Sequence, residues 1–333
     1  MKSFDLGRSA LSSCAVLALL AGCGGSQPPI GAPGGMSQSR AIATQAGDGR
    51  SWMLPEAKKE NLLYVVDKGA NDVFVYSYPK RKLVGTLSLH VPTGDCVDRA
   101  GNIWIDIGET SGPPAIQEYA HGGTTAISTL YFPDDGDDQT SCSVDRTTGN
   151  LAATSFFGTV YIYIKAEGVA QTYAGPAWNS DEYCVYDDSG DLYVDGTMGN
   201  PFYPRTTLFE LKKDQQRYRR LWFHPGIHFT FYPGGIQWSD NQLIFGDVNS
   251  GSSESLVYHV RAHGRSVTLS RTTVLNLDGR VYQFWIQGKT LIAPYYTSGG
   301  GGVAFFNYPA GGNPISTITG LEQPVAAAVS LVR

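Results

Sequence analysis

A strand pair that recurs six times is the feature that most constrains the fold of this 333-residue chain. Turns rich in Asp, Gly and Asn precede most copies. Each copy is followed by a strand with alternating side-chain character, and then by a fourth strand with a weaker pattern. The copies begin at Leu63, Ile103, Leu151, Leu192, Leu243 and Leu291, with spacings of 40, 48, 41, 51 and 48 residues. Four short strands per unit at this spacing are typical of propeller blades. The sequence therefore predicts an all-β fold, a six-bladed β-propeller.

The two ends of the repeat region indicate how the ring closes. We name the strands of each blade a to d, from the ring centre outwards. The first copy lacks strand a, because residues 52–60 are polar and include a proline, whereas a surplus strand at 324–329 follows the last copy. We expect this C-terminal strand to complete the N-terminal blade, which removes an exposed sheet edge.

The N-terminus has the pattern of a bacterial lipoprotein signal. Lys2 and Arg8 precede an apolar run at 10–20, which ends in the lipobox Leu20-Ala21-Gly22-Cys23. We expect cleavage before Cys23 and lipidation of its sulfur, since two or three acyl chains anchor a protein stably to a membrane. A cleaved signal with a chance cysteine is the alternative. The predicted location is the cell envelope, on the periplasmic side or at the cell surface.

Composition divides the rest of the chain into a tether and one domain. Residues 24–50 are rich in Gly, Pro, Ser, Gln and Ala and contain no aromatic residue, so they cannot form a core. The predicted organisation is a signal peptide at 1–22, a lipid-anchored flexible tether at 23–57 and the propeller at 58–333. Cleavage removes Lys2, Arg8 and Asp5, so the formal net charge changes from -5 to -6. This balance disfavours nucleic acid as a partner, and we expect a monomer.

The propeller geometry sorts loops onto two faces. The loops joining b to c and d to the next a form the conventional ligand face, and here they are acidic and rich in aromatic residues. Such a mouth suits a cationic ligand, a carbohydrate or a peptide, because rings stack on sugars or cations and carboxylates accept hydrogen bonds. The predicted ligand-binding residues are Trp178, Glu182, Tyr203, Tyr232, Tyr295 and Tyr296. The alternative is structural, with aspartates capping turns and aromatic rings filling gaps between blades.

The opposite face collects basic c-to-d turns, including Lys80-Arg81-Lys82 and Lys212-Lys213. Because the tether leaves from this face, we expect it to turn towards anionic lipid headgroups and to leave the mouth free. Solvated hairpin tips are the alternative interpretation.

Two groups of residues are candidate metal ligands. The run Asp134, Asp135, Asp137 and Asp138 supplies the hard oxygen ligands that calcium prefers, with a solvated loop as the alternative. His224 and His228 form a candidate zinc pair, although Pro225 and Gly226 exclude a helix between them and an extended strand would hold them about 13 Å apart. No cofactor is predicted beyond calcium or another divalent metal at these positions.

Three cysteines fall in strand a of consecutive blades. For Cys96, Cys142 and Cys184 we weigh three interpretations: buried small hydrophobic residues, a Cys142–Cys184 disulfide between neighbouring blades, and a thiolate metal or reactive site. The first is favoured.

Segments such as 61–67 (NLLYVVD) and 97–104 (VDRAGNIW) resemble the NHL-type repeat and, less closely, the gluconolactonase/senescence-marker and virginiamycin B lyase families. The resemblance covers nearly all of 61–329 and implies the fold more than the chemistry. Gluconolactonase resemblance implies a metal on the channel axis, but Gly234 and Gln237 stand where that family's Asn-Gly-x-Asp stretch has two polar ligands. Lyase resemblance implies a catalytic histidine, for which His224 or His228 is the nearest candidate.

The predicted function is a ligand-binding, protein-binding or scaffold module on a lipid anchor, acting through its acidic and aromatic face. A small molecule, a carbohydrate or a protein is the expected ligand. A metal-dependent lactonase-type hydrolase or lyase, with its site at the central channel, is the alternative.

Overall fold

The computed structural model describes residues 50–108, 113–133, 139–156, 158–174, 183–200, 203–224, 233–248 and 253–333. All described residues belong to one unit. In the described part, no helix is long and apolar enough to cross a membrane.

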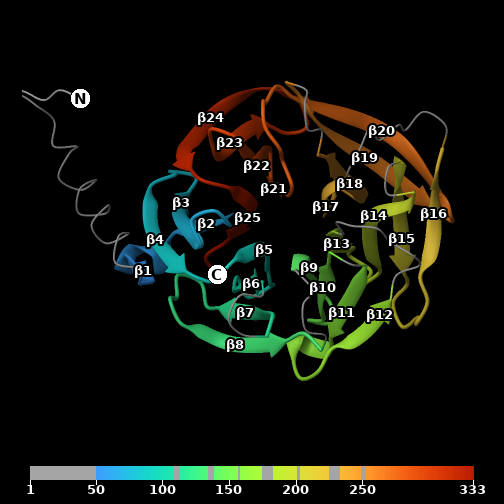
Figure 1. Cartoon of the computed structure of the whole chain (residues 1–333), viewed down its shortest axis with the longest axis horizontal. Helices are drawn as coiled ribbons and strands as arrows, with labels where there is room; N and C mark the ends of the chain where they lie inside the picture. Colours follow the sequence, from blue (N-terminus) through green and yellow to red (C-terminus); the bar gives the residue numbers. More distant parts are fainter. Residues whose placement is uncertain are drawn as a thin grey trace, which may run out of the picture. The chain divides into compact units, whose positions relative to one another are not determined.

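The described strands form six antiparallel blades arranged in a ring (Figure 1). Blade 1 contains β25 (Pro324–Ser330), β2 (Asn61–Asp67), β3 (Asp72–Tyr78) and β4 (Leu83–Ser88), from the centre outwards. Blade 2 contains β5 (Pro92–Val97), β6 (Ile103–Ile107), β7 (Ala115–Tyr119) and β8 (Ala126–Tyr131). Blade 3 contains β9 (Gln139–Val144), β10 (Leu151–Ser155), β11 (Thr159–Tyr163) and β12 (Gln171–Ala174), with the short 3₁₀ helix η2 (Ile164–Ala166) after β11.

The second half of the ring repeats this order. Blade 4 contains β13 (Tyr183–Tyr186), β14 (Leu192–Asn200), β15 (Tyr203–Leu211) and β16 (Arg219–Phe223). Blade 5 contains β17 (Pro233–Ser239), β18 (Gln242–Asp247), β19 (Ser255–His263) and β20 (Ser266–Leu275). Blade 6 contains β21 (Trp285–Gln287), β22 (Thr290–Thr297), β23 (Gly300–Asn307) and β24 (Gly311–Leu321). The predicted all-β propeller fold is confirmed, and the described strands group into six blades.

The hydrophobic core lies between neighbouring blades. Because side chains alternate along a strand, Leu62, Tyr64 and Val66 of β2 pack with Ile103 and Ile105 of blade 2. The intervening residues of β2 pack in a second cluster with residues of blade 6. Burial of both faces explains why β2 is a nearly continuous apolar run rather than an alternating one.

Ring closure follows the predicted route. Strand β25 pairs antiparallel with β2 from Leu62↔Ser330 to Asp67↔Pro324. The Asp67 carboxylate accepts hydrogen bonds from the main-chain N–H groups of Glu322 (2.8 Å) and Gln323 (2.7 Å), immediately before β25 begins. These contacts fix the register of the closing strand.

Pairing at the outer strands goes beyond the repeat pattern. Residues Trp52 and Met53, in the segment predicted as a tether, form β1 (Trp52–Met53) and pair with Thr86 and Gly85 of β4, and the 3₁₀ helix η1 (Pro55–Lys59) follows. A Cβ atom at Gly85 would lie 2.2 Å from the Met53 sulfur, so glycine makes room for this fifth strand. Outer strands β16, β20 and β24 are also joined by parallel pairs. Blades 4, 5 and 6 therefore share one continuous sheet.

Candidate ligand-binding site

A cavity of about 280 Å³ opens where the inner strands begin, and we call it the mouth cavity. Thr93 and Thr140 lie at the starts of strands a, whereas Lys68 and Phe156 directly follow the ends of strands b. Each strand a starts, and each strand b ends, on the face formed by the b-to-c and d-to-a loops. The mouth cavity therefore lies on the face that the sequence indicates for a ligand.

A stacked pair of tyrosines forms one wall of the mouth cavity. The rings of Tyr282 and Tyr296 are 5.7 Å apart and inclined by 5°, and the Tyr296 hydroxyl donates to the Tyr282 oxygen at 3.2 Å. Arg280 Nη1 donates to the same Tyr282 oxygen at 3.4 Å. Burial is the main reason that the pKa of Tyr282 rises to about 12, so the phenol keeps its proton at neutral pH. The pair forms an aromatic wall with a fixed polar edge.

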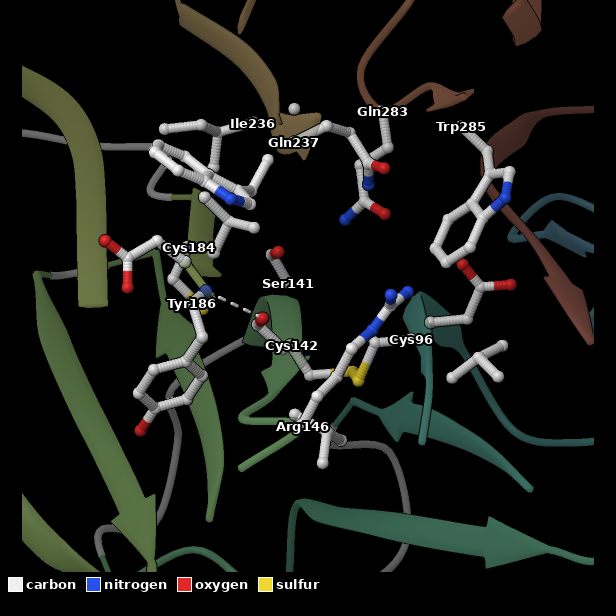
Figure 2. Close-up of a pocket in the computed structure, with 18 of the residues that line it drawn as sticks. Cys96, Ser141, Cys142, Arg146, Cys184, Tyr186, Ile236, Gln237, Gln283 and Trp285 are labelled. Atoms are coloured by element: carbon white, nitrogen blue, oxygen red, sulfur yellow. Dashed lines mark hydrogen bonds between the residues drawn. A yellow bond between two sulfur atoms is a disulfide. The ribbon is translucent and has the colours of Figure 1, made fainter. Parts of the chain in front are cut away.

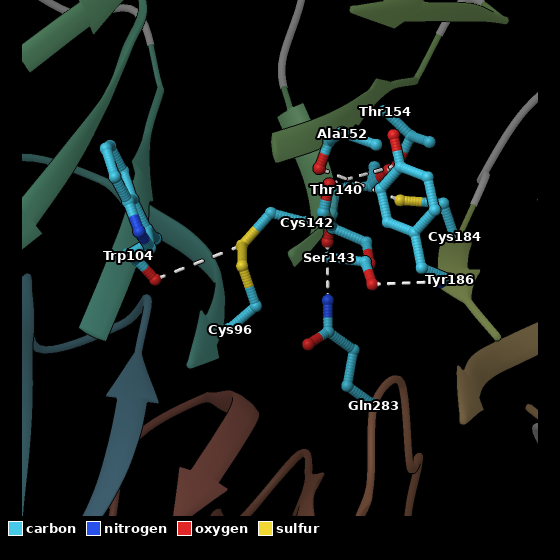
Figure 3. Close-up of a disulfide and its surroundings, with 11 residues drawn as sticks. Cys96, Trp104, Thr140, Cys142, Ser143, Ala152, Thr154, Cys184, Tyr186 and Gln283 are labelled. Carbon is cyan, nitrogen blue, oxygen red and sulfur yellow. Dashed lines mark hydrogen bonds between the residues drawn. A yellow bond between two sulfur atoms is a disulfide. The ribbon is translucent and has the colours of Figure 1, made fainter. Parts of the chain in front are cut away.

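The floor of the mouth cavity is formed by Gln283, which reaches across the central channel. Its Nε2 donates a 2.6 Å hydrogen bond to the main-chain oxygen of Thr140 in β9, on the far side of the ring (Figure 3). The Thr93 hydroxyl beside it is buried and has no hydrogen-bond partner in the described part of the chain. It is therefore available to a ligand or to water.

Asp106 lies against this floor. A Cβ atom at Gly94 would come within 2.7 Å of Asp106 Oδ2 and 2.9 Å of the Thr140 oxygen, so only glycine fits there. Asp106 is fully buried, and among the described residues neither carboxylate oxygen has a hydrogen-bond partner. Burial raises the pKa of Asp106 to about 7, because the charged form loses its hydration.

Several described aspartates at the strand ends near the mouth have structural roles. Asp67 binds the chain before β25, and Asp195 accepts a hydrogen bond from the Tyr183 N–H (3.0 Å) in the same way. Asp247 is also buried, close to the Tyr258 hydroxyl (3.5 Å). In the described lining of the mouth cavity, the charged residue is Lys68 and no carboxylate is present. These strand-end aspartates match the capping alternative.

Of the predicted ligand-binding residues, Tyr295 and Tyr296 have side chains that the structure describes. Tyr296 lines the mouth cavity, whereas Tyr295, pointing to the other side of β22, packs against the apolar cluster between blades 5 and 6. Tyr203 begins β15, and its side chain lies outside the described part. Trp178, Glu182 and Tyr232 lie outside the described residues. Sequence reasoning missed Tyr282, whose position in the d-to-a loop before β21 is the signal that could have identified it.

Of the predicted metal ligands, His224 is the one that lies within the described residues. His224 is exposed directly after β16, and its main-chain N–H donates to the main-chain oxygen of Val267 (3.0 Å). His228, Asp134, Asp135, Asp137 and Asp138, like the predicted lipidation site Cys23, lie outside the described residues. Among the residues described, no group of three or more His, Cys, Asp or Glu side chains could hold a metal ion.

The cysteine interpretations need correction. Cys96 of β5 and Cys142 of β9 form a disulfide that joins blades 2 and 3, with Cα atoms 5.6 Å apart (Figure 3). Among the described cysteines, Cys184 is the buried one that forms no disulfide, and its thiol donates to the Ala152 oxygen at 3.9 Å. Both the favoured view of three buried thiols and the Cys142–Cys184 pairing are therefore wrong. All three cysteines line a second, smaller cavity in the channel (Figure 2).

Fold and site together define a β-propeller with a cavity at the mouth of its channel. No protein-family model and no curated protein matches the chain. Among solved structures, it is similar to a chain of the nidogen/laminin complex, with 14% identity, a TM-score of 0.63, and coverage of 82% of this chain and 99% of that one. A protein of unknown function from Bacteroides caccae follows with 10% identity, a TM-score of 0.59, and coverage of 81% and 99%. Hydrazine synthase of Kuenenia stuttgartiensis has 15% identity, a TM-score of 0.55, and coverage of 78% and 83%. At such identities the likeness shows the fold alone.

Proposed function

We propose that this protein is a lipid-anchored, extracytoplasmic β-propeller that binds a carbohydrate in its mouth cavity. The tyrosine pair Tyr282–Tyr296 is the observation that carries the proposal, because its rings are held parallel and stacked in the wall of a cavity of about 280 Å³. Ligand pockets commonly measure roughly 300 to 1,000 Å³ and combine aromatic walls with a few fixed polar groups. The anchor rests on the lipobox that ends in Cys23.

The polar lining favours a neutral, hydroxylated ligand over a cation. Gln283 and Gln323 present amides, Thr93 has an unused hydroxyl, and Lys68 is the charged residue of the described lining. Amides and hydroxyls both donate and accept hydrogen bonds, as sugar hydroxyls require. Aromatic rings pack against the apolar face of a sugar as well as against cations, but the Lys68 ammonium in the described lining repels a cationic ligand.

A binding screen with a matched pair of variants tests the site. Full-length protein in detergent is screened against a panel of neutral oligosaccharides and a panel of peptides. We expect saturable binding of an oligosaccharide that Tyr296→Ala weakens at least tenfold, since it removes one stacked ring. Tyr131→Ala, 59% exposed on the outer strand β8, is the control and should bind as the wild type does. Binding of peptides alone, or equal binding by Tyr296→Ala, would contradict the proposal.

The anchor is tested separately in cells. An alkyne-labelled fatty acid should be incorporated into the wild-type protein and sediment with membranes, and Cys23→Ser should abolish both. Labelling that persists in Cys23→Ser would reject the lipobox as the anchor.

A further inference from the structure

The central channel holds a second cavity of about 100 Å³, which we call the channel cavity (Figure 2). It is lined by the inner strands β5, β9, β13 and β17 together with Gln283–Trp285. Gln283 borders both cavities. The channel cavity extends to Arg146 and Asp188 in the a-to-b turns, and so it opens on the face opposite the mouth.

Arg146 places a cation in this cavity. It follows Asp145 in the turn after β9, is exposed, and makes no hydrogen bond or ion pair in the described part of the chain. In Figure 2 its side chain extends past the Cys96–Cys142 disulfide into the middle of the cavity. A guanidinium is always charged, and its planar fork matches the two oxygens of a carboxylate.

Asp95 provides a second unused polar group. It borders the same cavity, is 5% exposed, and neither of its carboxylate oxygens makes a hydrogen bond within the described residues. Burial, and next the neighbouring Asp106, raise the pKa of Asp95 well above its usual range, although the Ala328 N–H facing it lowers the pKa slightly. Burial therefore favours the protonated form of Asp95, and in that form the carboxyl group can donate a hydrogen bond.

Two indole rings contribute apolar surface to the remaining walls. The indole N–H of Trp238 donates to Asp188 (3.0 Å) and that of Trp285 to Gln287 (3.3 Å), so their rings offer apolar surface. Asp187 and Asp188 place negative charge at the rim. This charge disfavours a multiply charged anion such as phosphate, which one arginine would not neutralise.

We propose that the channel cavity is a binding site for a small monocarboxylate, whose carboxylate pairs with Arg146 and accepts a hydrogen bond from Asp95. A short alkyl chain would lie against the indoles of Trp238 and Trp285. This site is separate from the mouth cavity, so the proposal does not depend on carbohydrate binding.

The turns of neighbouring blades provide a matched control. Arg99 follows Asp98 in the turn after β5, as Arg146 follows Asp145 after β9, and the two turns are closed by equivalent bonds, Asp98 N–H to Asn102 O and Asp145 N–H to Asn150 O. Arg99 does not line the channel cavity. Replacing either arginine removes the same charge from the same kind of turn, but only Arg146 borders the proposed site.

Full-length protein in detergent is titrated with sodium propionate, at ionic strength held constant with sodium chloride. Calorimetry gives the affinity, and tryptophan fluorescence is an independent reading of the indoles in the wall. We expect one propionate per chain, an affinity at least tenfold weaker in Arg146→Ala, an intermediate one in Arg146→Lys, and wild-type binding in Arg99→Ala. Circular dichroism verifies that the variants are folded.

Several results would overturn the assignment. The assignment fails if propionate shows no saturable binding, or if wild type and Arg146→Ala bind it with equal affinity. It also fails if Arg99→Ala loses as much affinity as Arg146→Ala does, or if inorganic phosphate or propylamine binds more tightly than propionate. Tyr296→Ala should bind propionate as the wild type does. A loss there would show that the carboxylate occupies the mouth cavity instead.

Discussion

The side-chain amide of Gln283 donates a 2.6 Å hydrogen bond to the main-chain oxygen of Thr140, joining blade 6 to blade 3 across the centre of the ring. The main-chain N–H of Gln283 also donates to Val325 of the closing strand (3.2 Å). One residue therefore ties three blades together and separates the mouth cavity from the channel cavity.

Gln283→Ala should destabilise the ring and connect the two cavities. The variant loses a partly buried hydrogen bond and the contacts of a side chain that is 8% exposed. We expect the free energy of unfolding in urea to fall by about 1–3 kcal/mol, the usual cost of a buried polar group that loses its partner. Gln216→Ala, at an exposed position, is the control. An unchanged midpoint in Gln283→Ala would show that the contact across the channel contributes nothing.

The disulfide predicts a definite thiol count. Without reduction, alkylation of denatured protein should modify Cys184 but neither Cys96 nor Cys142, and reduction should expose both. Replacing Cys96 and Cys142 together by alanine should lower the free energy of unfolding by about 2–4 kcal/mol, because the bond closes a long loop in the unfolded chain. A cross-linked peptide containing Cys184 would contradict this connectivity.

The blades and ring closure could be predicted because both depend on local signals. Each hairpin carries its own turn residues, and the surplus strand at β25 corresponds to the missing inner strand before β2. The parallel pairs β16–β20 and β20–β24 have no such signal, since they depend on how far the outer strands reach towards neighbouring blades. The repeat pattern likewise gives no signal for the pairing of the two-residue strand β1 with β4.

The candidate site was only partly predictable, because it depends on side-chain direction and long-range contacts. Tyr295 and Tyr296 are neighbours in β22, and the register alone decides that Tyr296 lines the mouth cavity while Tyr295 packs between blades. Cys142 has a cysteine in the inner strand on either side, so the repeat pattern could not choose between Cys96 and Cys184. The contact between Gln283 and Thr140 links residues 143 positions apart, which no local pattern encodes.

Asp67→Asn should weaken ring closure. Asp67 accepts main-chain hydrogen bonds from Glu322 and Gln323 on its two different oxygens, and an asparagine can supply only one of those acceptors. We expect the free energy of unfolding in urea to fall by about 1–3 kcal/mol, since a main-chain N–H loses its partner. Asp214→Asn is the control, because this exposed residue has a φ of 61° that asparagine tolerates. Equal stability of both variants would show that these bonds do not fix β25.

Asp106 should make the protein less stable as the pH rises towards neutrality. Its pKa is about 7 in the folded protein, against the ordinary value of 3.8, so between these pH values the folded chain holds a proton that the unfolded chain has lost. The stabilisation is fully present below pH 3.8 and is lost as the pH rises through about 7. Each pKa unit corresponds to about 1.4 kcal/mol of folding free energy. Above neutral pH, the buried charge of Asp106 therefore lowers the free energy of unfolding by roughly a few kcal/mol.

Asp106→Asn isolates this effect, because asparagine has nearly the same shape and does not titrate. Wild type and variant are unfolded in urea at pH 5 and pH 8, and the change between the two pH values is compared rather than the absolute stability. The pKa of Asp95 is raised as that of Asp106 is, so Asp95 adds to the loss of stability as the pH rises. Burial lowers the pKa of His121 and His259, so these two histidines oppose that loss. The two histidines remain in both proteins and cancel in the comparison. Asp106 contributes to the raised pKa of Asp95, so Asp106→Asn also lowers the pKa of Asp95 and changes the pH dependence in the same direction. We expect the wild type to lose more stability than Asp106→Asn, with exposed Asp278→Asn as the control. Parallel pH profiles for wild type and Asp106→Asn would mean that the buried carboxyl group does not control this pH dependence.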